Sequence, residues 1–194
     1  MQLGRSDQKP VLEVIIFSTR PGRVGLPVGH WIYEKAKGDG RFDVRLVDLK
    51  EVNLPFLDEP KHPRFGEYEH EHTKRWSEIV SQADAFVFVV PEYNFGMSGA
   101  TKNAIDFLHK EWNYKPVGFV SYGGISGGIR AVQMIKQVVT TVKMVPLVEA
   151  VHIPFVQNFI KDGQFCENQE LDNAAKIMFE ELFRWVQALK TLRT

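Results

Sequence analysis

Three short stretches of the sequence combine hydroxyl, charged and glycine residues, and each directly follows an apolar run. They span residues 18–25, 91–99 and 121–128. Apolar runs without polar alternation are typical of strands that are buried on both faces of a parallel sheet. The carboxyl ends of parallel strands share one edge, which is where open α/β sheets bind their ligands. The sequence therefore predicts that the three loops lie together and form one ligand site.

The first loop has the residue types of a phosphate site. Ser18 offers a hydroxyl, Arg20 and Arg23 offer positive charge, and Gly22 lets backbone N–H groups turn toward an anion. No Gly-Lys-Ser/Thr follows, and the dinucleotide fingerprint is reduced to Gly22-x-x-Gly25. This composition favours a phosphate monoester. An ordinary strand-to-helix turn with solvated arginines is the open alternative.

The other two loops have unusual backbone requirements. Pro91 cannot donate a ladder hydrogen bond and so ends the apolar run, Asn94 tolerates left-handed backbone angles, and Ser98 can cap the next helix. The third loop contains four glycines, which would let backbone N–H groups approach a planar acceptor closely. A glycine-rich helix start is the alternative interpretation of that loop.

Strand and helix patterns alternate along the chain. Strands are expected at residues 11–17, 42–49, 85–90, 116–121 and 145–151. Helices are expected after the first loop, ending at Gly38 and Gly40, and at about 72–82, 99–112, 129–142 and 169–192. This alternation predicts an α/β fold with a doubly wound parallel sheet. Residues 1–10 are expected to form a flexible tail and residues 11–194 a single domain. The proline-rich stretch 50–66 is expected to be a long, ordered loop.

The composition excludes several classes of protein. Among 194 residues, 24 Lys and Arg balance 24 Asp and Glu, which argues against nonspecific binding to nucleic acid or to a membrane surface. The single cysteine, Cys166, cannot form an internal disulfide, and the spacing in Glu69-His70-Glu71-His72 does not suit a metal site. Without an apolar run long enough to cross a bilayer or to act as a signal, we expect a soluble cytoplasmic protein.

Several motifs together carry a family resemblance. The segments 17–23 (Phe-Ser-Thr-Arg-Pro-Gly-Arg), 91–94 (Pro-Glu-Tyr-Asn), 102–106 (Lys-Asn-Ala-Ile-Asp) and 121–124 (Ser-Tyr-Gly-Gly) occur in this order. With this spacing the chain resembles the NADPH-dependent FMN reductase family from residue 11 to about 156. The resemblance implies a flavodoxin-like fold, with strand order 2-1-3-4-5 and helices on both faces. It also implies FMN as cofactor and NADPH or NADH as electron donor.

The resemblance also implies roles for particular residues. The FMN phosphate would be held by Ser18, Arg20 and the backbone of Gly25 and Leu26. The flavin ring would be lined by Pro91, Glu92, Tyr93 and Asn94, and its pyrimidine end would be contacted by Ser121, Gly123 and Gly124. The family often has glycine where this chain has Phe17, and a second hydroxyl residue where it has Val24-Gly25. Flavin N5 would take the hydride, so no side chain is assigned as catalytic.

The leading functional hypothesis is an NAD(P)H-dependent oxidoreductase that reduces quinones, flavins or similar small acceptors by a ping-pong mechanism. The resemblance further implies a homodimer or homotetramer. For the 2′-phosphate of NADPH, Arg23 and Arg130 are candidate contacts. The alternative hypotheses are an FMN-binding electron carrier or redox-sensing partner with little turnover, and a nucleotide-binding module without redox function.

Overall fold

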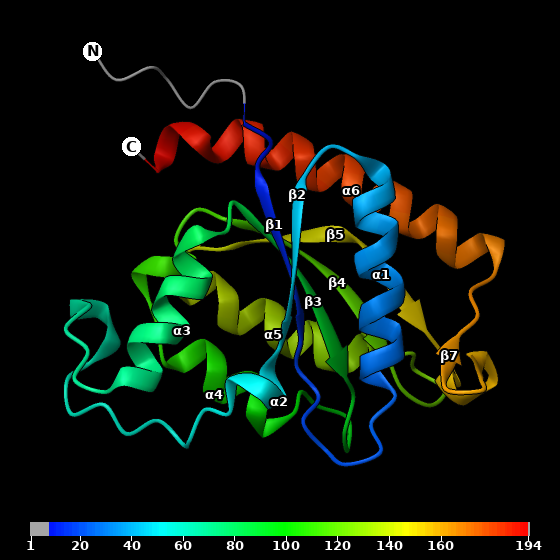
Figure 1. Ribbon diagram of the computed structural model, residues 1–194, viewed down its shortest axis with the longest axis horizontal. Coiled ribbons are helices and arrows are strands. Elements are labelled where there is room, and N and C mark those ends of the chain that lie inside the picture. Colours follow the sequence, from blue (N-terminus) through cyan, green and yellow to red (C-terminus); the bar gives the residue numbers. More distant parts are fainter. Residues whose placement is uncertain (1–7, 194) are drawn as a thin grey trace.

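Five parallel strands form the central sheet, in the order β2-β1-β3-β4-β5 (Figure 1). A computed structural model describes residues 8–193, so residues 1–7 of the predicted tail lie outside the described residues. The strands are β1 (Val11–Ile16), β2 (Asp43–Asp48), β3 (Ala85–Pro91), β4 (Pro116–Tyr122) and β5 (Val145–Ile153). This is the predicted flavodoxin-like order, in which β1 and β3 flank the point where the winding reverses.

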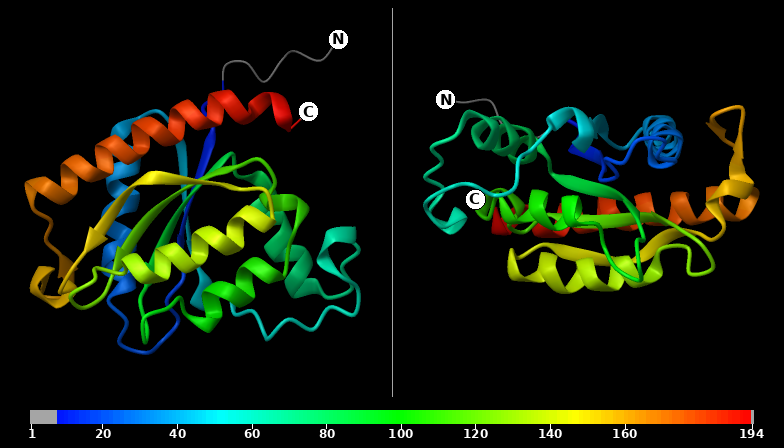
Figure 2. Two further views of the ribbon diagram at one scale, coloured as in Figure 1. Left: turned by 180° about the vertical axis from the view of Figure 1, so that it is seen from behind. Right: turned by 90° about the horizontal axis from the view of Figure 1, so that it is seen from below.

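Helices cover both faces of the sheet (Figure 2). The helices α1 (Gly25–Asp39) and α6 (Gln169–Leu189) pack on one face, and α3 (Glu71–Gln82), α4 (Gly99–Asp106) and α5 (Ile129–Thr141) pack on the other. Alternation along β1 explains the two layers, because Leu12, Val14 and Ile16 join the core under α1 and α6. Ile15 and Phe17 join the core under α3, α4 and α5. No helix in the described part of the chain is long and apolar enough to span a bilayer.

The ends of two helices can be compared with the sequence-based expectation. The helix α1 ends before Gly40, one of the two glycines expected there, whose φ of 79° suits glycine, but it continues through Gly38. The helix α4 ends at Asp106 instead of extending to about Trp112, which lies in a separate 3-10 turn, Lys110–Trp112. Trp112 is fully buried and its Nε1 donates to the Ile105 carbonyl at 3.1 Å. Burying this indole requires the chain to leave the helix and fold back.

Several short elements were not predicted. The helix α2 (Leu49–Val52) opens the proline-rich loop, and a small antiparallel hairpin pairs β6 (Ile160–Lys161) with β7 (Gln164–Phe165). Further 3-10 turns span Pro63–Phe65, Val156–Phe159 and Lys190–Leu192. The proline-rich loop is tied to α4, because the Asn103 side chain donates to the Pro55 carbonyl at 2.7 Å and accepts from the Leu57 N–H at 3.0 Å.

Candidate functional site

The three loops meet at the carboxyl edge of the sheet, as predicted (Figure 1). Backbone hydrogen bonds between neighbouring strands fix their starting points. The Phe17 N–H donates to the Val89 carbonyl, and the Glu92 N–H donates to the Tyr122 carbonyl, both at 3.0 Å. Loops that leave β1, β3 and β4 are therefore held side by side by the sheet itself.

A close approach between the first and third loops occurs at Gly25. A Cβ at this position would lie 2.1 Å from Ser18 Oγ and 2.2 Å from the Tyr122 hydroxyl, so only glycine fits. Both hydroxyls are buried and have no hydrogen bond of ordinary geometry within the described residues. Burial raises the pKa of Tyr122, although the nearby Ser18 hydroxyl and arginines oppose this effect. The phenol therefore stays protonated and can donate a hydrogen bond to an anion.

The start of α1 adds further donors at the same place. The backbone N–H groups of Gly25 and Leu26 have no acceptor among the described residues, and the first turn of α1 contains no acidic residue. Arg20 is exposed at the rim of the loop. Free N–H groups at a helix start, two protonated hydroxyls and an arginine are the donor set that suits a phosphate monoester. The residues present therefore fit the phosphate of FMN.

Arg23 has a different role from the one suggested by its position in the sequence. Its guanidinium forms an ion pair with Asp48, at the end of β2, and donates to the Ser18 carbonyl at 2.9 Å. The Arg23 side chain is 8% exposed. It braces the first loop against β2, and its charge is already neutralised by Asp48.

The second loop contains a tight turn with two residues at positive φ. The Tyr93 and Gly96 backbones exchange two hydrogen bonds of 3.0 Å across Asn94 (φ 50°) and Phe95 (φ 69°). Asn94 tolerates this conformation, but a bulky residue such as Phe95 pays about 1–2 kcal/mol for it. Backbone strain of this kind gathers at ligand sites. The turn presents Tyr93 and the 69%-exposed ring of Phe95 beside the predicted flavin position.

Glu92 joins the second loop to the third. Its carboxylate accepts from the backbone N–H of Arg130 at 3.1 Å and from Arg130 Nε at 2.7 Å. Burial alone would raise the pKa of Glu92, but the hydrogen bonds from Arg130 and Ser126 hold it below its usual range. The Glu92 side chain is thus committed to Arg130, which leaves its backbone to line the site. Arg130 is paired in turn and also stacks on Phe95, 3.8 Å from the ring centroid.

Hydrogen bonds of the Ser121 side chain fix the third loop to the sheet. The Ser121 hydroxyl is fully buried, donates to the Gly127 carbonyl at 2.7 Å and lies 2.6 Å from His152 Nδ1. Burial and the nearby Lys136 lower the pKa of His152, so the ring is neutral at neutral pH. Because one hydroxyl donates one proton, the ring must carry its proton on Nδ1 and donate it to Ser121. The hydroxyl of Ser121 therefore holds the loop and does not face the ligand side.

The two glycines at the start of this loop differ in what they can offer. The Gly123 N–H donates to the Ile153 carbonyl at 3.3 Å, whereas the Gly124 N–H has no acceptor within the described residues. Gly124 is exposed and Gly123 half-buried. The Gly124 N–H is thus the one of the pair that is available to a planar acceptor.

Sequence reasoning missed three residues that shape this site: Asp48, Tyr122 and His152. Tyr122 stands between Ser121 and Gly123, both predicted site residues, so position alone could have drawn attention to it. Asp48 and His152 lie far along the chain from Arg23 and Ser121, the residues that they bind. No local pattern connects such pairs, because the strand pairing brings them together.

Comparisons with known proteins show the family to which the chain belongs. Residues 12–158 match the model of the NADPH-dependent FMN reductase family. The NAD(P)H-dependent FMN reductase ntnL of a Nectria species is 32% identical over 93% of this chain and 96% of its own length. The NAD(P)H-dependent FMN reductase C4B3.06c of Schizosaccharomyces pombe is 42% identical over 75% of this chain and 74% of its own length.

A solved structure with the same fold is FerB, a flavoenzyme NAD(P)H:(acceptor) oxidoreductase from Paracoccus denitrificans. The alignment has a TM-score of 0.72, covers 92% of this chain and 98% of FerB, and has 19% sequence identity. The chain therefore belongs to the NADPH-dependent FMN reductase family. It is an FMN-dependent oxidoreductase that takes electrons from NAD(P)H.

Proposed function

We propose that the three loops form one FMN site, with the phosphate at the start of α1 and the flavin ring between the second and third loops. The observation that carries this proposal is the packing of Gly25 against the Ser18 and Tyr122 hydroxyls, which leaves two buried donors without ordinary partners beside free backbone N–H groups. Buried polar groups need partners. A bound phosphate monoester would satisfy both hydroxyls and the N–H groups of Gly25 and Leu26, with Arg20 closing the rim.

The part of the protein in the reaction is to hold FMN and to orient its flavin ring. When bound, FMN supplies a centre that accepts a hydride and passes on two electrons. The backbones of Pro91, Glu92, Tyr93 and Asn94 line one side of the ring position. The free Gly124 N–H is placed to stabilise negative charge at the pyrimidine end, which is a form of electrostatic preorganisation. No side chain has to donate or remove a proton.

The open face beside the turn at residues 93–96 is the place where NADPH or NADH and a small acceptor bind in turn. The exposed Phe95 ring, backed by Arg130, offers a flat apolar wall that suits quinones and free flavins. Both arginines that the sequence suggested for the 2′-phosphate of NADPH, Arg23 and Arg130, are already paired with carboxylates. Neither arginine is therefore free to bind that phosphate, and we propose that the enzyme uses either NADPH or NADH. We also propose that it works in the cytoplasm.

Exposed apolar side chains surround this face. Ile125 is 79% exposed, and Ile129, Met134 and Phe155 are also exposed. We propose that a second copy of the chain covers part of this surface in a homodimer or homotetramer. Covering such side chains is a common reason for oligomerisation.

Initial-rate kinetics test the proposed sequence of steps. Rates would be measured with NADPH and a quinone, each varied at several fixed concentrations of the other. Exchange of donor and acceptor at one face predicts parallel lines in double-reciprocal plots. Intersecting lines would show that NADPH and the quinone bind at the same time. This result would contradict the proposal of one shared binding face but would not affect the proposal of FMN binding.

A further inference from the structure

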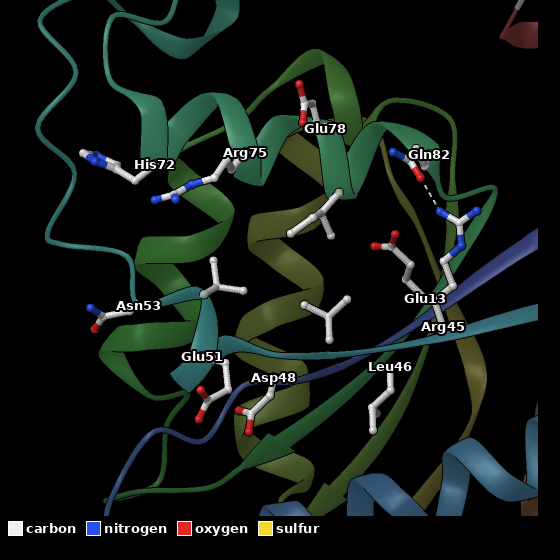
Figure 3. Close-up of a pocket in the computed structure, with 13 residues that line it drawn as sticks. Glu13, Arg45, Leu46, Asp48, Glu51, Asn53, His72, Arg75, Glu78 and Gln82 are labelled. Carbon is white, nitrogen blue, oxygen red and sulfur yellow. Dashed lines mark hydrogen bonds between the residues drawn. The ribbon is translucent and has the colours of Figure 1, made fainter.

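A cavity of about 750 Å³ lies between the edge strand β2, the short helix α2 and α3 (Figure 3). Its apolar lining includes Leu46, Val47, Val52 and Ile79. The charged lining consists of four carboxylates and two guanidinium groups: Glu13, Asp48, Glu51, Glu78, Arg45 and Arg75. The cavity is separate from the three loops of the proposed FMN site, although Asp48 borders both the cavity and the first loop. The lining therefore joins an apolar patch to a larger set of charged and polar groups, a combination that suits an amphipathic small molecule.

Glu13 is the most unusual group in this cavity. It is 1% exposed, and its Oε2 has no hydrogen-bond partner within the described residues. In Figure 3 its carboxylate points toward the middle of the cavity, with Arg45 and Gln82 beside it. Arg45 donates to the Gln82 side chain instead of to Glu13. A buried carboxylate oxygen without a donor is costly, and a ligand that brings a donor would remove this cost.

The charges around the cavity favour a cationic ligand. Asp48 is already paired with Arg23, and Arg45 is paired with Asp43, whose Oδ2 lies 3.9 Å from Arg45 Nη2. Within residues 8–193, Glu51 and Glu78 form no ion pair. With Glu13 they leave three carboxylates against Arg75. An anion would meet this excess of negative charge, whereas an ammonium group would be attracted by it.

We propose that this cavity binds an amphipathic organic amine, whose ammonium group reaches Glu13 and whose apolar body lies on Val47, Val52 and Ile79. Arg45 and Gln82 are exposed and cover Glu13 from the solvent side. Both are long, flexible side chains on the outside of β2 and α3. Entry of the amine requires them to part, which breaks a contact at the protein surface only.

The state of Glu13 gives this site a characteristic pH dependence. Burial raises the pKa of Glu13 to about 7, against the opposing charges of Lys115 and Arg45. Glu78 of α3 faces the same cavity. The amine binds the carboxylate form, so binding must drive a proton off Glu13 at pH values below 7. The affinity then rises as the pH rises toward 7 and levels off above it.

Titration of the FMN-loaded protein with hexylamine, followed by NMR chemical shifts of the backbone amides in β2 and α3, tests the proposal. Hexan-1-ol is the neutral control of the same shape. The proposal predicts that hexylamine binds about tenfold more tightly near pH 8 than near pH 6, because one proton is released. Hexan-1-ol should bind more weakly and without pH dependence. Equal binding of the two probes, or no binding of hexylamine at millimolar concentration, would overturn the proposal.

The variant Glu13→Gln identifies the group responsible. It keeps the shape of the side chain and removes its charge, so hexylamine binding should weaken about tenfold or more and lose its pH dependence. Burial also lowers the pKa of Lys115 to about 8, and Lys115 remains in this variant. A pH dependence that persists in Glu13→Gln would therefore assign the effect to Lys115 and contradict the proposal. Glu180→Gln, on the exposed side of α6, is the matched control and should change nothing.

Discussion

Arg130 binds Glu92 through both its backbone and its side chain. The Arg130 N–H lies 3.1 Å from Oε2, Nε lies 2.7 Å from Oε1, and Nη2 lies 2.6 Å from Oε1. Glu92 follows β3 and Arg130 lies in the first turn of α5, so this pair joins two of the three loops. The same guanidinium stacks on Phe95. The Glu92 carboxylate thus positions both the third loop and, through Arg130, the ring of Phe95.

Replacing Glu92 with alanine should loosen both features. The Glu92 side chain is 6% exposed, so its loss leaves the Arg130 N–H and Nε without their partner. We expect about 1–2 kcal/mol of lost stability and about tenfold weaker FMN binding. Chemical denaturation and fluorescence titration with FMN would measure these two effects. The matched control is Glu181→Ala, which breaks the surface pair with Arg184 and should leave FMN affinity unchanged.

The close approach at Gly25 predicts a severe effect from a single methyl group. In Gly25→Ala the new Cβ would meet the Ser18 and Tyr122 hydroxyls at 2.1 and 2.2 Å. We expect a loss of about 1–3 kcal/mol in stability and at least tenfold weaker FMN binding, since both donors must move. Gly38→Ala is the control within the same helix. No atom lies within 4 Å of its Cβ position, so this variant should gain about 0.5–1 kcal/mol. Equal effects of the two substitutions would contradict the close packing of Gly25 against the Ser18 and Tyr122 hydroxyls.

The parallel sheet and the meeting of the three loops were predictable because they follow from the hydrophobic patterning, and the strand order was implied by the family resemblance. What local patterns could not show was the partner of each polar side chain. Arg23 has the sequence context of a phosphate ligand, yet the register of β1 and β2 brings Asp48 to it. The resemblance implied a ligand contact for Ser121, yet the pairing of β4 with β5 places His152 beside it. Glu13 interrupts an apolar strand, and only the structure shows that it opens into a cavity.

The phosphate assignment can be tested by comparing two ligands. Arg20 is exposed at the rim, so Arg20→Ala should fold normally and weaken FMN binding several-fold through one lost charge-assisted contact. Riboflavin lacks the phosphate, and its affinity should not change. Fluorescence titrations of both ligands with both proteins give the comparison. An equal loss for FMN and riboflavin would place Arg20 beside the ring instead of the phosphate.

The buried Glu13 should make stability depend on pH. Burial raises its pKa from 4.5 to about 7 in the folded protein. Between these two values the unfolded chain releases a proton that the folded chain keeps, so the contribution of Glu13 to stability falls as pH rises through this range. Glu13→Gln removes the free-energy cost of ionising this buried side chain. We expect the variant to exceed the wild type by about 3 kcal/mol near pH 8 and by little near pH 4.5.

Denaturant unfolding of both proteins across this pH range measures the difference. A constant difference between Glu13→Gln and the wild type would mean that Glu13 titrates normally in the folded state. A difference that grows toward high pH and levels off above 7 would confirm the direction of the shift.

The visible absorption spectrum of the purified protein, recorded without oxygen before and after addition of NADPH, tests the central claim most directly. An FMN-dependent reductase should show the absorption bands of an oxidised flavin, lose them on addition of NADPH and regain them when a quinone is added. A flavin spectrum that does not respond to NADPH or NADH would contradict the reductase function and favour an electron carrier. A colourless protein that takes up no added FMN would contradict the site itself.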